Sequence, residues 1–157
     1  MNITEICAYL RNYFVPADKR ENRFYIHSGT FTVKDGKIFP VEFLKENQYF
    51  RVVGSALNDG VYCNCTNDLK TLKNETFDGA VHEMAVPPAF LKLCKDIEAW
   101  REKNESTEST NMSPFVSESF GGYSYSKSGN RTNSGNSGNA VTWQNQFANR
   151  LNTWRKI

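Results

Sequence analysis

Apolar residues recur every three or four positions in three stretches of the chain, and this spacing predicts three helices. The stretches cover residues 3–14, 90–100 and 143–154. Asn2 and Glu5 are expected to form a capping pair for the first helix, and Pro16 to stop it. Pro87-Pro88 is suited to begin the second helix, and Thr142 to cap the third.

Between residues 23 and 86 the period changes to the alternation that is typical of strands. Strands are expected near 24–27 and at 30–34, 37–41, 49–53, 61–65 and 80–86. Asp35-Gly36 predicts a tight hairpin turn, and a second turn is expected at Asp78-Gly79. We therefore expect an α+β fold: a small curled antiparallel sheet or partial barrel, with an N-terminal helix, a central amphipathic helix and a C-terminal helix on a flexible arm.

The composition divides the chain into three regions. Residues 1–103 are expected to form a compact α+β domain, and residues 140–157 the C-terminal helix. Residues 104–139 between them are rich in Ser, Gly and Asn, and such a segment should be mobile when alone. Within this arm the aromatic island 113–126 alternates as a strand does, so it favours pairing with a sheet edge over a helix. A loop packed on its own domain is an equal alternative.

The C-terminal stripe carries two tryptophans, which are favoured anchors of protein interfaces. We interpret this helix and the aromatic island as partner-binding, although a helix folded back on the second helix would have the same pattern. The predicted partner-binding residues are Phe115, Phe120, Tyr123, Tyr125, Trp143, Phe147, Arg150, Leu151, Trp154 and Arg155.

The charge is unevenly distributed. The net charge is +2, and all 17 acidic residues lie within residues 1–118. The charged residues of the remainder of the chain are all basic, so a basic tail follows a mildly acidic body. No apolar run is long enough to cross a membrane, and the N-terminus lacks a signal-peptide pattern, so we expect a protein that stays in the cytosol and binds no membrane.

Candidate chemistry is sparse. The four cysteines are expected to be free thiols, because the CxC pair Cys63 and Cys65 with two distant single cysteines does not match the spacing of a zinc site. His27 and His82 are the only histidines, and neither has the spacing of a catalytic triad. The acids between residues 75 and 83 are expected at the surface. We therefore predict no enzyme, no catalytic residues, no metal and no cofactor.

Three segments resemble structural proteins of bacteriophages and prophages. They are residues 54–62 (GSALNDGVY), 75–81 (ETFDGAV) and 113–126 (SPFVSESFGGYSYS). The last, between an amphipathic helix and a final one, is similar to an element of head-tail connector (adaptor, neck) proteins. The strand-rich region 23–86 departs from the usual small helical connector.

This resemblance implies a non-enzymatic virion protein that self-associates into a ring, often of twelve subunits. Such a ring would bind the portal protein and other neck or tail proteins, and DNA would pass through its channel. The protein would then lie in the host cytoplasm during assembly and in the virion neck afterwards. The alternative reading from the residues is a small β-barrel module that binds nucleic acid through aromatics and a basic tail.

Overall fold

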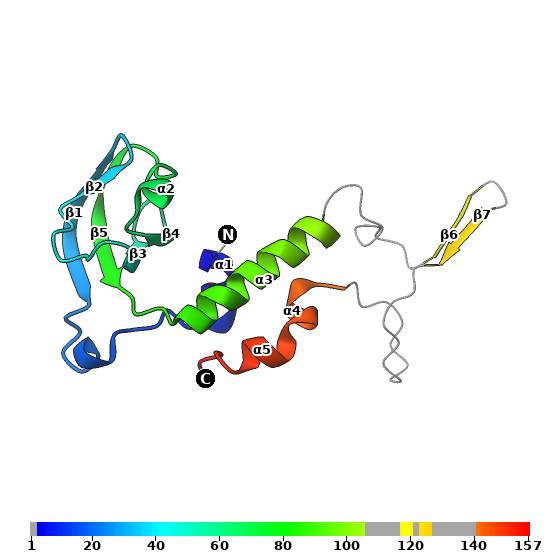
Figure 1. The fold of residues 1–157 in the computed structure, drawn as a ribbon. Helices are drawn as coiled ribbons and strands as arrows, with labels where there is room; N and C mark the ends of the chain where they lie inside the picture. The colour runs from blue at the N-terminus through cyan, green and yellow to red at the C-terminus, as the bar shows by residue number, and fades with distance from the viewer. Residues whose placement is uncertain (1–2, 106–116, 121–122, 127–140) are drawn as a thin grey trace. The chain divides into compact units, whose positions relative to one another are not determined.

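The computed structural model describes residues 3–105, 117–120, 123–126 and 141–157 (Figure 1). The chain forms two compact units. The first contains residues 2–91 together with 155–157, and the second contains residues 92–154. The predicted α+β fold with a small, curled antiparallel sheet is confirmed.

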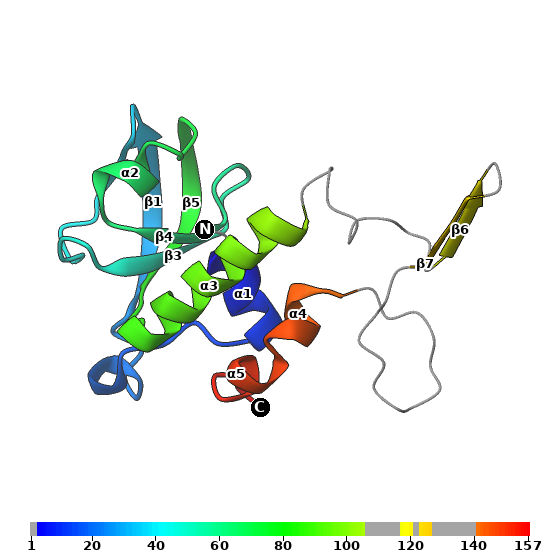
Figure 2. The ribbon, with the colours of Figure 1, turned by 45° about the vertical axis from the view of Figure 1, so that its right-hand side comes forward.

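A five-stranded sheet forms the centre of the first unit. Its strands are β1 (Ile26–Lys34), β2 (Lys37–Phe39), β3 (Tyr49–Val53), β4 (Gly60–Cys63) and β5 (Glu75–Glu83). They lie in the order β2-β1-β5-β3-β4, and every neighbouring pair is antiparallel. The sheet curls so strongly that β3 and β4 run across the direction of β1 and β5 (Figure 2). The curled sheet is therefore a half-barrel, and it encloses a hydrophobic core. The buried residues of this core are Phe31, Val33, Ile38, Leu44, Phe50, Val52, Leu72, Phe77 and Val81.

The predicted hairpin turn between β1 and β2 is confirmed. Asp35 and Gly36 both have positive φ angles, of 50° and 71°, as a type I′ turn requires. The register Lys34↔Lys37 closes the hairpin directly on this turn. The local sequence therefore predicts this turn correctly.

The predicted turn at Asp78-Gly79 is wrong, because both residues lie inside β5. Gly79 serves a different purpose there: a Cβ atom on it would lie 2.2 Å from the carbonyl oxygen of Val53, at the end of β3. Gly54 continues this close approach, with a φ of 90° and a Cβ position 3.1 Å from the Cα of Gly79. A glycine inside a strand often marks such a contact between two backbones.

Three short helical segments complete the first unit: α1 (Ile3–Leu10), the 3₁₀ turn η1 (Ala17–Lys19) and α2 (Thr66–Leu69). The helix α1 ends four residues earlier than predicted, because Arg11 adopts a φ of 53°, outside the helical region. Its predicted cap residue Asn2 lies outside the described residues. The helix α2 was not predicted, since a single turn leaves no periodic pattern in the sequence.

The helix α3 (Pro88–Asn104) begins at the predicted prolines in the first unit and continues into the second. The predicted C-terminal helix is capped by Thr142, as expected, since its hydroxyl oxygen accepts a hydrogen bond from the backbone N–H of Asn145. The prediction of one continuous helix is wrong, because the chain leaves helical geometry at Phe147, which has a φ of −106° and a ψ of 12°. Two short helices result, α4 (Trp143–Gln146) and α5 (Ala148–Asn152).

The second unit also contains a separate two-stranded antiparallel sheet. It consists of β6 (Ser117–Phe120) and β7 (Tyr123–Ser126), in the register Phe120↔Tyr123 and Glu118↔Tyr125. This sheet lies within the aromatic island, so the expectation of strand rather than helix structure there holds for its described residues.

Candidate functional site

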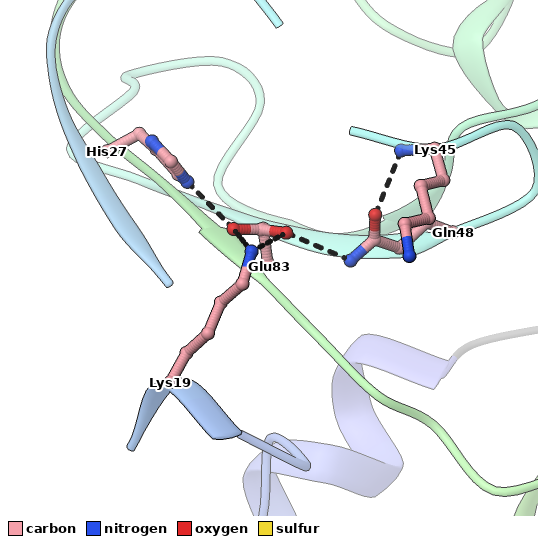
Figure 3. A network of polar contacts seen from close by, with 5 residues as sticks. All are labelled: Lys19, His27, Lys45, Gln48 and Glu83. Atoms are coloured by element: carbon pink, nitrogen blue, oxygen red, sulfur yellow. Dashed lines mark hydrogen bonds and ion pairs between the residues drawn. The ribbon is translucent and has the colours of Figure 1, made fainter. Parts of the chain in front are cut away.

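A buried polar site of the first unit surrounds Glu83, the last residue of β5. Its side chain is only 3% exposed. Lys19 Nζ lies 2.9 and 2.8 Å from the two carboxylate oxygens, and His27 Nε2 lies 2.9 Å from Oε2. Gln48 Nε2 donates a longer hydrogen bond of 3.4 Å to Oε1 (Figure 3). Three segments of the chain therefore converge on the carboxylate of a fourth, β5.

The strand period explains why Glu83 is buried. Phe77, Val81 and Glu83 are two or four residues apart on β5, so they share the face of the strand that lines the core. The expectation that the acids of this stretch all lie at the surface is wrong for Glu83. Burial of a carboxylate is costly unless the charge is paired and hydrogen-bonded, and Lys19 and His27 meet that requirement.

Two opposing influences act on the pKa of Glu83. Burial is the largest and raises the pKa, because it disfavours the ionised form. The hydrogen bonds from Lys19, His27 and Gln48, together with the positive charge of Lys19, outweigh burial and lower the pKa below its ordinary value. Glu83 is therefore held as a carboxylate.

Lys19, His27, Gln48 and Glu83 together hold segments of the chain in place, and we call this group the Glu83 clasp. Its geometry leaves Glu83 poorly suited to act as a base. Both oxygens already accept hydrogen bonds from charged or polar donors. His27 is fixed in addition by Phe43, whose ring is stacked on the imidazole with centroids 3.5 Å apart and planes 10° apart. Gln48 is oriented from its other end, where its Oε1 accepts a hydrogen bond from the backbone N–H of Lys45 (Figure 3). The clasp connects η1, β1 and the segment before β3 to the end of β5.

The second histidine lies in a different environment. His82 packs edge-on against Tyr25, with ring centroids 5.8 Å apart. Burial is the main cause that lowers the pKa of His82, and the nearby Arg51 and His27 lower it further. The Arg51 guanidinium in turn lies 3.8 Å from the ring centroid of Tyr13. The positive charge of Arg51 therefore lies against an aromatic ring of the same unit.

A second carboxylate organises the loop between β3 and β4. Glu75 accepts hydrogen bonds from the Ser55 hydroxyl, from the backbone N–H groups of Ala56 and Leu57, and from the side chain of Asn58. The bond from Ser55 is the largest influence and lowers the pKa of Glu75, against a smaller opposing effect of burial. The loop holds Leu57 with 54% of its surface exposed.

Asn58→Ala should loosen this loop and lower the free energy of unfolding by about 1 to 3 kcal/mol. Asn58 is 1% exposed, and its amide bonds both the N–H and the C=O of Lys73. Denaturant unfolding measures the loss, and hydrogen exchange of the loop amides locates it. Leu57→Ala is the control and should change stability by less than about 0.5 kcal/mol. Equal effects of the two substitutions would contradict the assigned role of Asn58.

The cysteines are free thiols, and Cys7 and Cys94 are fully buried on helix faces, as predicted. Burial raises the pKa of Cys94 to about 12. Burial, followed by the hydrogen bond with Cys65, raises the pKa of Cys63 to about 12 as well. Among the described residues, no three His, Cys, Asp or Glu side chains lie together as metal ligands would.

The predicted partner-binding residues of the C-terminal segment divide by exposure. Trp143 and Leu151 are 3% and 1% exposed, so they contribute to the interior of the chain. In the second unit the ring of Phe147 packs edge-on against Trp100, and Arg150 forms an ion pair of 2.7 Å with Asp96. These two contacts agree with the alternative expectation, in which the C-terminal helical segment folds back on the central helix, α3.

Two other predicted residues lie near the C-terminus. Trp154 is half-buried, and Arg155 is exposed and belongs to the first unit. The Arg155 guanidinium lies 4.9 Å from the ring centroid of Tyr9. A partner-binding role for these residues stays a prediction.

The predicted residues of the aromatic island lie mainly in the two-stranded sheet. Phe120 ends β6, and Tyr123 and Tyr125 lie in β7. Phe115 lies outside the described residues. Sequence reasoning identified this segment from its alternation but missed Glu83, Lys19 and Gln48, because their proximity depends on how the sheet closes.

Comparison with known proteins yields no relative: no family model, curated protein or solved structure matches the chain. Within the part of the chain that the structure describes, no helix has the length and apolar character that crossing a membrane requires.

Proposed function

We propose that the chain is a structural protein of a bacteriophage particle, a head-tail connector that joins the portal or head to the tail. In this role it self-associates into a ring around the channel through which DNA passes, and it catalyses no reaction. The segment that resembles connector proteins contains both strands of the β6–β7 sheet, and this observation carries the proposal.

An isolated two-stranded sheet is only marginally stable in water. Each strand of the β6–β7 sheet has four residues, and among the described residues this sheet contains two strands. Further strands or a packed surface would stabilise it, and a flexible segment that gains order on a partner is a common mode of recognition. A binding role therefore accounts for this element better than a role within the monomer.

The body of the chain is suited to carry such an element. The Glu83 clasp and the loop around Glu75 use their charges to hold neighbouring segments in place. The exposed Arg155 supplies positive charge near the C-terminus, where an acidic partner surface would be attracted.

Size-exclusion chromatography with light scattering tests the proposal, with the chain alone and with the portal protein from the same genome. We expect a complex with portal, and we expect the double substitution Tyr123→Ser and Tyr125→Ser to weaken it at least about tenfold, as loss of aromatic anchors does. Phe24→Ser with Phe39→Ser removes two exposed aromatics of the first unit and is the matched control. It should leave the complex intact.

Two results would contradict the connector role. One is a chain that joins neither portal nor itself at any salt concentration. The other is tight binding to single-stranded DNA that weakens steeply with salt, which would favour the nucleic-acid-binding alternative.

A further inference from the structure

The two edges of the five-stranded sheet differ in their capacity to accept another strand. On the outer edge, β4 is closed by side chains: the N–H of Val61 donates to Thr4 Oγ1 at 2.9 Å, and the N–H of Cys63 donates to Asp68 Oδ2 at 2.8 Å. Backbone donors that are already paired offer no template for a further strand. Growth of the sheet at β4 is therefore blocked.

The opposite edge is open over part of β1. The short β2 pairs only with Thr32–Lys34, whereas β5 pairs with β1 from Ile26 to Val33. Among the described residues, no strand pairs with Ile26–Phe31 on the side of β2.

Strand alternation identifies the backbone groups on this open side. The N–H of Glu83 donates to the carbonyl of Tyr25, so odd-numbered residues of this segment bond toward β5. The N–H and C=O groups of Ser28 and Thr30 therefore point to the side where β2 is absent. Ser28, Gly29 and Thr30 are all exposed.

This segment lacks the features by which proteins protect an edge. Natural edges carry Lys, Pro or a bulge, or are very short. The sequence Ile26-His-Ser-Gly-Thr30 has no Lys and no Pro, and it pairs with β5 in unbroken register. A Cβ on Gly29 would meet no atom within 4 Å, so the face of the strand is uncovered at this position.

The same chain contains a strand suited to this edge. Only two residues separate β6 from β7, so Phe120 and Tyr123 form the bonded closing pair of the hairpin. By alternation, Ser124 and Ser126 then direct their backbone groups away from β6. The strand β7 is uncharged, whereas β6 carries Glu118, and charge on an edge strand opposes pairing.

We propose that the β1 edge of one copy, at Ser28 and Thr30, accepts strand β7 of a second copy. Among the described residues, β1 and β7 belong to two different sheets. The contact joins unlike surfaces, so repetition gives a closed ring or an open filament. The inference rests on the proposed assembly function for its expectation of self-association, and it names the surfaces that are used.

Proline substitution tests the contact, because it removes one backbone donor. Ser28→Pro removes an N–H that faces solvent in the monomer, a position where edge strands tolerate proline. We expect the wild-type chain and Ser28→Ala to self-associate with rising concentration, and Ser28→Pro to remain a folded monomer by light scattering and circular dichroism. Self-association should also slow hydrogen exchange at the Thr30 amide at least about tenfold.

A mixing experiment tests the pairing of donor and acceptor. Ser124→Pro blocks β7, and Ser124→Ala is its control. A mixture of Ser28→Pro and Ser124→Pro chains retains one intact edge and one intact β7, so it should form dimers that grow no further. Each variant alone should be monomeric.

Three results would overturn the inference: a wild-type chain that stays monomeric, a Ser28→Pro chain that self-associates like the wild type, or Thr30 protection that is independent of concentration. A Ser28→Pro chain that self-associates and still binds portal would refute the edge contact alone, and the proposed function would stand. A wild-type chain that associates neither with itself nor with portal would refute both the edge contact and the proposed function.

Discussion

Gly79→Ala should lower the free energy of unfolding by about 3 kcal/mol, at the upper end of the cost of overpacking. The added methyl group would meet the Val53 carbonyl oxygen at 2.2 Å, and backbone cannot rotate away as a side chain can. Relief requires β3 to move from β5, which would weaken the pairs Val52↔Val81 and Val53↔Ala80. Denaturant unfolding of the purified chain measures the loss, and failure to fold would be its extreme form.

The sheet provides a matched control for this substitution. Gly29 lies directly opposite Gly79 in the register of β1 and β5, and a Cβ there meets nothing within 4 Å. Gly29→Ala should therefore change stability by less than about 1 kcal/mol, with a small gain because alanine restricts the unfolded chain. Similar losses from the two substitutions would show that glycine is required for its flexibility, and the proposed backbone contact would be wrong.

Glu83→Gln should lower the free energy of unfolding by about 2 to 3 kcal/mol at neutral pH. The substitution preserves shape but replaces hydrogen bonds to a charged acceptor, each worth roughly 1.5 to 3 kcal/mol, by weaker ones. Lys19 would lose the carboxylate that it binds through both oxygens. Chemical denaturation of wild type and variant at pH 7 measures the difference.

The pH dependence of this difference has a defined sign. The pKa of Glu83 is lowered in the folded state from an ordinary value of 4.5. A lowered pKa contributes stability that is complete above the unfolded pKa and is lost as pH falls through the folded one. The contribution of the Glu83 carboxylate to the advantage of the wild type over Glu83→Gln should thus shrink as the pH falls below about 4.5.

Asp96→Asn is the control for burial. The Asp96–Arg150 ion pair has a similar distance of 2.7 Å, but its side chains are 39% and 48% exposed. Exposed pairs contribute about 0 to 1 kcal/mol, so this substitution should have little effect.

A double-mutant cycle of Lys19→Met and Glu83→Gln should give a coupling energy above about 1 kcal/mol. A coupling near zero would exclude the clasp.

The parts of the fold that could be predicted from sequence are those determined by neighbouring residues. Asp35-Gly36 fixes its hairpin because both residues tolerate positive φ. The start of α3 follows from its prolines, and Thr142 caps α4 through a bond only three residues long. In each case the chemistry and the structure lie within one turn of the chain.

The parts that could not be predicted depend on contacts between distant segments. Asp78-Gly79 has the composition of a turn, but β3 crosses there and makes the glycine part of a strand. Glu83 is indistinguishable from a surface acid until Lys19, 64 residues away, is brought to it. The aromatic island 113–126 could be identified as a candidate binding segment because its alternation lies within a few neighbouring residues. The open edge of β1 could not be predicted, because it depends on how far β2 pairs along β1.

The last three residues give the chain an unusual connectivity. Residues 155–157 return to the first unit, where the N–H of Lys156 donates to the carbonyl of Leu10 and Arg155 covers Tyr9. Everything between Leu91 and Arg155 is consequently an insertion with both ends fixed to one body. Closing a chain segment at both ends removes part of its conformational freedom, so a partner that binds such a segment restricts it at a smaller entropic cost than it would a free tail.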